Sequence, residues 1–312
     1  MHIKPSENRQ LFGMNDYFYE ITKLYNEKKM PNTILLSGKK GLGKSTLAYH
    51  IINYILSLNE DYKYDVGKLN INKENKSYKL IQNNSHPNFF LIDLIDDKKS
   101  IDIAQVREMI TYTNKSSFNN MHRFILIDKI ENLNKNSVNA LLKIIEDPND
   151  GIFFILINNN EKTILPTLKS RCLTFKINFT FNESINTANR LLDRNILDLI
   201  NTDIINYYTT PGEIINLVNV AEEKKIDLLE HNLKGLLKLL IDNGYYKKDK
   251  FVKKIIIDFI ELFFLKEYQL SAANKSLLVF YHNFLDKIHN VEKFNLDEES
   301  LFLEFKSKLL NG

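Results

Sequence analysis

The residues most suited to chemistry form a glycine-rich run, GKKGLGKS, at positions 38–45. The run fits the pattern G-x-x-x-x-G-K-[ST] at every position, and it lies between an apolar β-rich stretch and a helical pattern, as this motif requires. In such a loop the glycines let backbone N–H groups surround a phosphate, and the following helix adds the positive end of its dipole. The nucleotide-binding residues that the run predicts are Gly38, Gly41, Gly43, Lys44, Ser45 and Thr46.

Two side chains of this run would contact a nucleotide directly. Lys44 would reach the β- and γ-phosphates, and the hydroxyl of Ser45 would ligate Mg²⁺. We therefore expect the loop to bind ATP or ADP with Mg²⁺, with a surface turn rich in Gly and Lys as the alternative. The loop does not reveal which base is bound.

A second candidate follows the apolar run RFILI at 123–127, which ends in Asp128. A carboxylate at the end of a buried strand can reach the Mg²⁺ of a phosphate loop, so we predict that Asp128 and Ser45 form the metal-linked pair. The alternative is an aspartate that only caps the next turn.

The residue after Asp128 bears on hydrolysis. A hydrolysing ATPase needs a carboxylate or similar group to orient the attacking water, and its usual place is directly after the metal-linked aspartate. Here that residue is Lys129, which cannot act as a base while charged, and Glu131 is expected to point in a different direction. The sequence therefore predicts weak or absent intrinsic hydrolysis.

The composition is that of an ordinary globular protein, with 44% hydrophobic and 26% charged residues among 312. A formal net charge of +3 is too small to steer the whole molecule onto nucleic acid. The single cysteine, Cys172, excludes an intrachain disulfide and a multi-cysteine zinc site within this chain, and it favours a reducing cytoplasm. The first residues lack the apolar core of a signal peptide and the most apolar stretch, 255–265, is too short for a membrane span, so we expect no membrane association.

The order of apolar patterns predicts an α/β domain followed by helices. Up to residue 177, short β-rich runs alternate with helical patterns, which is typical of a parallel sheet covered by helices. Strands are predicted at 33–36, 89–94, 124–127 and 152–157, and Asn136 is predicted to cap a helix over 137–146. The segment 59–85 is polar and interrupts this pattern as an insertion.

Beyond residue 178 the strand signals give way to helical spacing. Leucines at 228, 229, 233, 236, 237 and 240 recur at this spacing. Such a stripe is expected to be intramolecular core, with subunit packing as the alternative. A cluster of charges at 222–225 places a domain boundary near residue 226.

Four runs give the sequence a specific resemblance to a known family. They are IDKIENLN at 127–134, SVNALLKIIEDP at 137–148, FILI at 154–157 and LPTLKSRC at 165–172. Together they resemble AAA+ clamp-loader subunits, and the resemblance is firm over residues 10–180 and diffuse beyond them. It implies an AAA+ P-loop domain at 1–177, a small helical lid at 178–225 and an all-α collar or oligomerisation domain at 226–312.

The resemblance also implies roles for two side chains. Arg171, in the S-R-C run, resembles the finger that reaches the ATP of a neighbouring subunit and stabilises γ-phosphate charge in trans. A surface salt bridge is the alternative for this arginine. Asn158 resembles the polar sensor of the γ-phosphate or attacking water, although Asn159 could equally serve. The implied partners are other clamp-loader subunits in a hetero-pentamer, a sliding clamp and primed DNA.

Within that family, three segments resemble the delta-prime type of subunit. They are HPN at 86–88, IAQVRE at 103–108 and TPGE at 210–213. Two departures accompany them. Glu213 stands where a second sensing arginine would be expected, and the insertion 59–85 has no cysteine where relatives usually carry a four-cysteine zinc module. We therefore expect no zinc, and His86 is better interpreted as a turn residue than as a metal ligand.

Two functions of different class remain. The leading hypothesis is a delta-prime-like assembly subunit that holds nucleotide statically and presents Arg171 to a motor subunit. The alternative is a motor subunit of the gamma or tau type that hydrolyses its own ATP, which Lys44 and Ser45 favour and Lys129 and Glu213 oppose. A small-molecule kinase is a third reading, but it would need an arginine-rich lid after the loop, and 59–85 contains no arginine.

Overall fold

The computed structural model describes residues 4–95, 98–115, 121–206, 208–247, 249–270, 275–294 and 299–310. By its internal contacts the chain forms two compact units. The first comprises Met1–Leu192 with Thr210–Glu213, and the second comprises Asp193–Thr209 with Ile214–Gly312. The predicted boundaries near residues 177 and 225 stay predictions.

Five strands form one sheet in the first unit, in the order β2-β3-β4-β1-β5, and every neighbouring pair is parallel. The strands are β1 (Thr33–Ser37), β2 (Phe89–Ile92), β3 (Arg123–Ile127), β4 (Ile152–Asn158) and β5 (Leu173–Lys176). The first four confirm the predicted strands to within two residues, and β5 is an additional edge strand. The sheet and the helices between its strands confirm the predicted α/β fold class.

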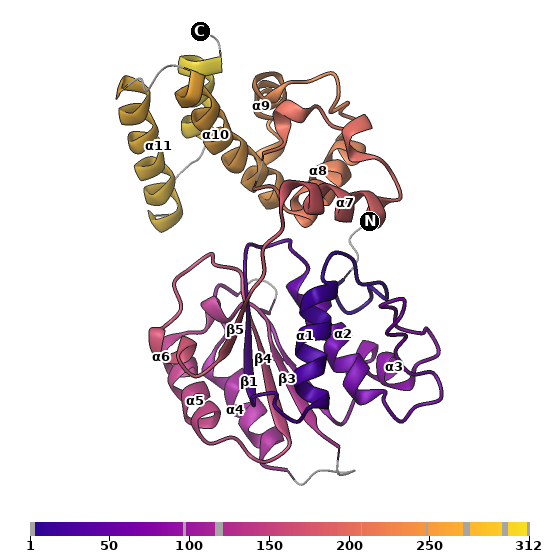
Figure 1. The fold of residues 1–312 in the computed structure, drawn as a ribbon. Helices are drawn as coiled ribbons and strands as arrows, with labels where there is room; N and C mark the ends of the chain where they lie inside the picture. The colour runs from indigo at the N-terminus through magenta and orange to yellow at the C-terminus, as the bar shows by residue number, and fades with distance from the viewer. Residues whose placement is uncertain are drawn as a thin grey trace. The chain divides into compact units, whose positions relative to one another are not determined.

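Helices cover both faces of this sheet. The first unit contains α1 (Asn15–Asn26), α2 (Lys44–Leu56), α3 (Lys76–Gln82), α4 (Ile103–Thr113), η1 (Ile130–Asn132), α5 (Lys135–Glu146), α6 (Pro166–Lys169) and α7 (Phe181–Leu192). Helices α1, α2 and α3 lie on one side of the sheet, and α4, α5 and α6 lie on the other (Figure 1).

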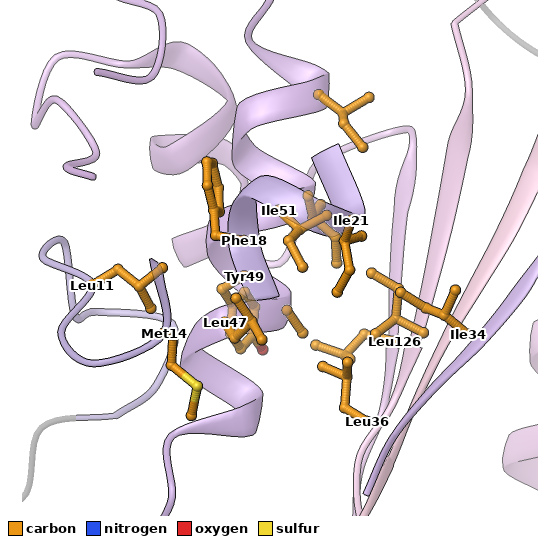
Figure 2. Packing of buried hydrophobic residues seen from close by; sticks show 14 of the residues in the cluster. Leu11, Met14, Phe18, Ile21, Ile34, Leu36, Leu47, Tyr49, Ile51 and Leu126 are labelled. Atoms are coloured by element: carbon orange, nitrogen blue, oxygen red, sulfur yellow. The ribbon is translucent and has the colours of Figure 1, made fainter. Parts of the chain in front are cut away.

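Alternate residues of β1 divide between two cores. Ile34 and Leu36 pack in the core shared with α1 and α2, whereas Leu35 packs in the core shared with α4 and α5. Figure 2 shows the first of these cores, where Ile34 and Leu36 face the helices that carry Ile21 and Ile51. Burial on both faces explains why the inner strands β3 and β4 are almost entirely apolar.

Helix α5 begins two residues before the predicted start. Its N-cap is Asn134, whose side chain accepts a hydrogen bond from the N–H of Ser137 at 2.9 Å. The prediction that Asn136 caps this helix was wrong, because Asn134 has the extended backbone that a cap requires while Asn136 already lies within the first turn. The helix ends at Glu146, ahead of Pro148, as predicted.

The insertion 59–85 is part of the first unit's core. Tyr64, Leu69 and Ile71 are buried in the core shared with α1 and α2. At the start of α3 the Glu60 carboxylate accepts hydrogen bonds from the N–H (3.0 Å) and the hydroxyl (2.6 Å) of Ser77. Apolar burial and hydrogen bonds therefore hold a segment that has no cysteine.

The second unit is helical throughout the part that the structure describes. It contains most of α8 (Pro211–Lys224), then α9 (Leu233–Asp242), α10 (Lys250–Leu270), α11 (Lys275–Phe294) and α12 (Glu299–Phe305), with the short η2 (Ile196–Asp198), η3 (Thr202–Ile204), η4 (Tyr245–Lys247) and η5 (Lys306–Leu310). Leu233, Leu236, Leu237 and Leu240 are buried on α9, as expected of intramolecular core, whereas Leu229 is exposed ahead of that helix. Among the described helices, none is long and apolar enough to cross a bilayer.

Candidate nucleotide site

The glycine-rich loop connects β1 to α2 at the carboxyl edge of the sheet. Gly41 and Gly43 adopt positive φ angles of 86° and 89°, a backbone conformation that favours glycine. Gly43 is the N-cap of α2, and Ser45 and Thr46 lie half-buried in the helix's first turn. Strand, loop and helix thus follow one another as the sequence predicts.

Lys44 is buried inside this loop, with 3% of its surface exposed. Its ammonium donates hydrogen bonds to the backbone carbonyls of Gly38 at 2.8 Å and Lys39 at 2.7 Å. Burial lowers the pKa of Lys44 to about 8, and the negative charges of Asp128 and nearby glutamates partly oppose that shift. The side chain is therefore an ammonium at neutral pH, enclosed by the loop that would bind phosphate.

Ser45 and Asp128 meet at the point where β1 and β3 end. The hydroxyl of Ser45 donates a hydrogen bond of 2.7 Å to Oδ2 of Asp128. Burial raises the pKa of Asp128, against the hydrogen bond from Ser45, which lowers it. A hydroxyl and a carboxylate are both hard oxygen donors, so this pair fits Mg²⁺ held together with nucleotide phosphates. The ion would neutralise phosphate charge there.

Lys129 turns away from the phosphate loop toward Asp93, which follows β2. Its ammonium lies 2.9 Å from Oδ1 of Asp93. Burial pulls the pKa of Lys129 down, but the hydrogen bond to Asp93 and the charges of Asp93 and Asp128 outweigh it and leave the pKa raised. The residue after Asp128 is therefore a charged, ion-paired lysine.

Glu131, which was expected to point in a different direction from residue 129, is a buried carboxylate. It lies in η1, only 8% exposed, and its Oε1 accepts a hydrogen bond of 3.1 Å from the N–H of Asn159. Its Oε2 is buried with no hydrogen-bond partner among the described residues. Burial raises the pKa of Glu131, and its charge in turn acts on Lys44. The turn of η1, which brings Glu131 back toward β4, has no clear signal in the sequence.

Asn158 ends β4 beside the start of the phosphate loop. Its Nδ2 donates to Asn160 Oδ1 at 2.7 Å and to Ser37 Oγ at 3.3 Å, and its Oδ1 accepts from the N–H of Asn160 at 3.1 Å. Asn158 thus has partners at the strand ends, while the backbone of Asn159 is bound to Glu131. Both sensor candidates lie at this edge, and the choice between them stays a prediction.

Residues Thr210–Glu213 lie directly on the phosphate loop, a contact that the sequence does not reveal. The N–H of Gly212 donates to the carbonyl of Gly41 at 2.9 Å. The carboxylate of Glu213 lies 2.9 Å from Lys39 Nζ and accepts a hydrogen bond of 2.8 Å from the N–H of Thr210. The resemblance predicts a sensing arginine at position 213. The structure shows that the glutamate found there pairs with Lys39, which the sequence does not reveal.

Arg171 lies at the opposite edge of the sheet from the loop. It precedes β5, which runs parallel to β1, whereas the loop follows β1. A five-residue strand such as β1 spans roughly 16 Å. The guanidinium lies 2.7 Å from Oε1 of Glu146 and donates to the carbonyl of Thr167 at 2.8 Å, with 37% of the side chain exposed. The structure therefore brings together every predicted site residue except Arg171.

Comparisons with known proteins place the chain in a family. A family model described as "DNA polymerase III, delta subunit" matches residues 14–180. The chain is 30% identical over 139 residues to DNA polymerase III subunit delta' of Pseudomonas aeruginosa, which covers 45% of this chain and 40% of that protein. It is 32% identical over 186 residues to subunit gamma of Buchnera aphidicola, which covers 58% of this chain and 48% of that protein.

A longer likeness joins the chain to a delta' subunit of the same Buchnera aphidicola. That match has 24% identity over 285 residues and covers 88% of this chain and 83% of the relative. The chain thus spans less than half the length of the first two relatives and most of the third. Since the family model matches more than half of its residues, the chain belongs to the DNA polymerase III delta-subunit family.

Proposed function

We propose that the chain is a delta-prime-like subunit of a clamp loader. It binds ATP or ADP with Mg²⁺ on the loop at 38–45 without turning the nucleotide over at a useful rate. It supplies Arg171 to the ATP of a neighbouring subunit in a hetero-pentamer, and so helps to load a sliding clamp onto primed DNA.

The position of Arg171 at the sheet edge opposite the loop is the observation that carries this proposal. An arginine that precedes β5 is about one strand length from its own phosphate loop, so it cannot stabilise charge on a nucleotide bound there. A guanidinium has five N–H donors, and the contacts with Glu146, Thr167 and Ser170 leave others for a phosphate. This supports an action on a nucleotide held by another chain.

The pairing of Lys129 with Asp93 supports the non-motor half of the proposal. A lysine held as an ammonium directly after Asp128 cannot accept a proton from water. Lys129 stands at the chain position, directly after Asp128, where a water-orienting carboxylate usually stands.

Reconstitution with the other clamp-loader subunits of the same organism tests the finger. Arg171→Ala should leave assembly intact on a sizing column and lower single-turnover ATP hydrolysis at the neighbouring site by about 10³-fold or more. Arg194→Ala is the matched control, because Arg194 is also an exposed arginine paired with a glutamate, Glu222. Hydrolysis at the wild-type rate in the Arg171→Ala complex would contradict the role of a finger in trans.

A motor subunit of the gamma type is the second candidate. The contact between Ser45 and Asp128 is intact, and Glu131 is a buried carboxylate with an unpartnered oxygen close enough to act electrostatically on Lys44. If this candidate holds, the isolated chain hydrolyses ATP near 1 per second, within the usual range of enzymes, and Glu131→Gln abolishes that activity. The leading proposal expects negligible turnover from the isolated chain.

A further inference from the structure

Three lysines around the phosphate loop are each paired with a carboxylate. Lys39 lies 2.9 Å from Glu213, Lys40 lies 3.6 Å from Glu161, and Lys129 lies 2.9 Å from Asp93. Lys44 forms no such pair with any residue that the structure describes, and its ammonium donates to loop carbonyls instead. The site thus contains several cations, but their charge is largely compensated by carboxylates that come from other parts of the chain.

Glu213 contacts the loop through both of its carboxylate oxygens. Its two oxygens lie 2.9 and 3.1 Å from Lys39 Nζ, and one of them also accepts the N–H of Thr210 at 2.8 Å. The backbone behind it is in close contact with the loop. A methyl group added at Gly41 would lie 2.4 Å from Thr210 Oγ1, and one added at Gly212 would lie 2.7 Å from the Cα of Gly41. The backbone that carries Glu213 therefore cannot move away from the loop without breaking this contact, and the bonds to Lys39 and Thr210 hold the carboxylate itself.

A carboxylate beside the loop repels a nucleoside triphosphate more than a diphosphate, because the triphosphate carries more negative charge. The diphosphate portion of a nucleotide is held by loop N–H groups, the dipole of α2 and Lys44, none of which depends on Lys39. A terminal phosphate adds negative charge, which Glu213 repels and which the ammonium of Lys39 could help Lys44 to compensate. Because Glu213 already binds Lys39, both effects disfavour the triphosphate.

We infer that Glu213 makes this site selective for a nucleoside diphosphate over the corresponding triphosphate. The inference rests on the proposed binding of nucleotide to the loop, and it adds which form the loop retains. A site that retains the diphosphate fits a subunit whose own nucleotide does not turn over.

Equilibrium binding to the full chain tests the selectivity directly. The dissociation constants of ADP and of a non-hydrolysable ATP analogue, each with Mg²⁺, would be measured by displacement of a fluorescent nucleotide at low salt. We expect the wild type to bind ADP about tenfold more tightly, which corresponds to about 1.4 kcal/mol. Because the Glu213 side chain is about one-third exposed, this ratio should shrink as salt rises.

Two variants with opposite expected effects test the assignment to Glu213. Glu213→Gln keeps an acceptor for the Thr210 N–H, removes the charge and releases Lys39, so the ratio should fall to about one, chiefly through tighter binding of the triphosphate. Lys39→Gln leaves the carboxylate uncompensated, so the ratio should rise above that of the wild type. Glu222→Gln, which breaks an ion pair in the second unit, is the control and should leave the ratio unchanged.

The failures of the two proposals are distinguishable. Equal affinities in the wild type, or a ratio that Glu213→Gln does not change, would overturn the selectivity while leaving nucleotide binding intact. If the wild type binds neither nucleotide, the proposed nucleotide site itself fails and the selectivity fails with it. Circular dichroism of each variant establishes that a changed ratio reports binding by a folded chain.

Discussion

The stability of the first unit should depend on pH through one buried histidine. His50, on α2, has no exposed surface. Its Nε2 lies 3.0 Å from the carbonyl of Asn8 and its Nδ1 lies 2.8 Å from the hydroxyl of Tyr64. Because a carbonyl only accepts, Nε2 carries the proton and Nδ1 accepts from Tyr64. The neutral ring therefore has a partner at both nitrogens, and protonation would leave a buried cation whose Nδ1–H faces a hydroxyl.

The size of the effect follows from the pKa of His50. Burial lowers this pKa from 6.5 to about 4, against the hydrogen bond to Asn8, which raises it. Above pH 6.5 the His50 ring is neutral in both the folded and the unfolded chain, and the free energy of unfolding has its full value. As the pH falls from 6.5 toward 4, the unfolded chain binds a proton that the folded chain does not, so the free energy of unfolding decreases. The loss is about 2 kcal/mol between pH 7 and pH 5, and about 3 kcal/mol in total.

Urea unfolding followed by far-ultraviolet circular dichroism measures this loss. The wild type and His50→Gln would be compared at pH 7 and at pH 5, so that groups titrating in both chains cancel. We expect the wild type to lose about 2 kcal/mol more than the variant over this interval. His282→Gln, at an exposed histidine of α11, should keep the wild-type dependence. Parallel pH dependences of the wild type and His50→Gln would refute the reasoning.

Two further predictions concern how the first unit is held together. Arg123 is buried and donates hydrogen bonds to three carbonyls at the end of α4, so Arg123→Met should lower the free energy of unfolding by about 2 to 4 kcal/mol in the same urea assay, with Arg123→Lys recovering only part of it. The insertion 59–85 is held by apolar burial and by Glu60, and no metal-binding group is found among the described residues, so EDTA should leave the melting temperature unchanged to within about 1 °C. A chelator-induced drop would contradict the second prediction.

The sequence predicts the sheet well where its strands are buried on both faces. The runs of β3 and β4, such as FILI at 154–157, are unbroken and apolar because helices cover each side of them. The edge strand β5 has no such signal, since only Phe175 among its four residues is buried. For a related reason, the sequence does not predict which residues of the insertion 59–85 belong to the core. Tyr64, Leu69 and Ile71 are scattered among polar residues, and only the tertiary fold places them together against α1 and α2.

In the candidate site, too, the sequence predicts residues that are close together in the chain and misses contacts between residues that are far apart. The loop at 38–45 is one contiguous motif, so its glycines, Lys44 and Ser45 can be identified from spacing alone. The ion pairs that surround it join residues 174 apart, as in Lys39 and Glu213, or 36 apart, as in Lys129 and Asp93. A single sequence contains no pattern that links such positions. The sequence does not reveal that Glu131 lies beside Asn159, because the η1 turn depends on contacts with β4.

The ion pairs also explain why one substitution at Lys129 would not by itself create a motor subunit. A glutamate placed there would stand beside Asp93, which now pairs with Lys129, and beside Asp128, whose pKa the charge of Asp93 already raises. Three adjacent carboxylates repel one another and tend to share a proton, so the added carboxylate would not act as the single water-orienting base of a motor subunit. The character of the site is therefore set by Lys129 and Asp93 as a pair. The same holds at the start of the phosphate loop, where Glu213 and Lys39 form a pair and each alters the charge of the other's surroundings.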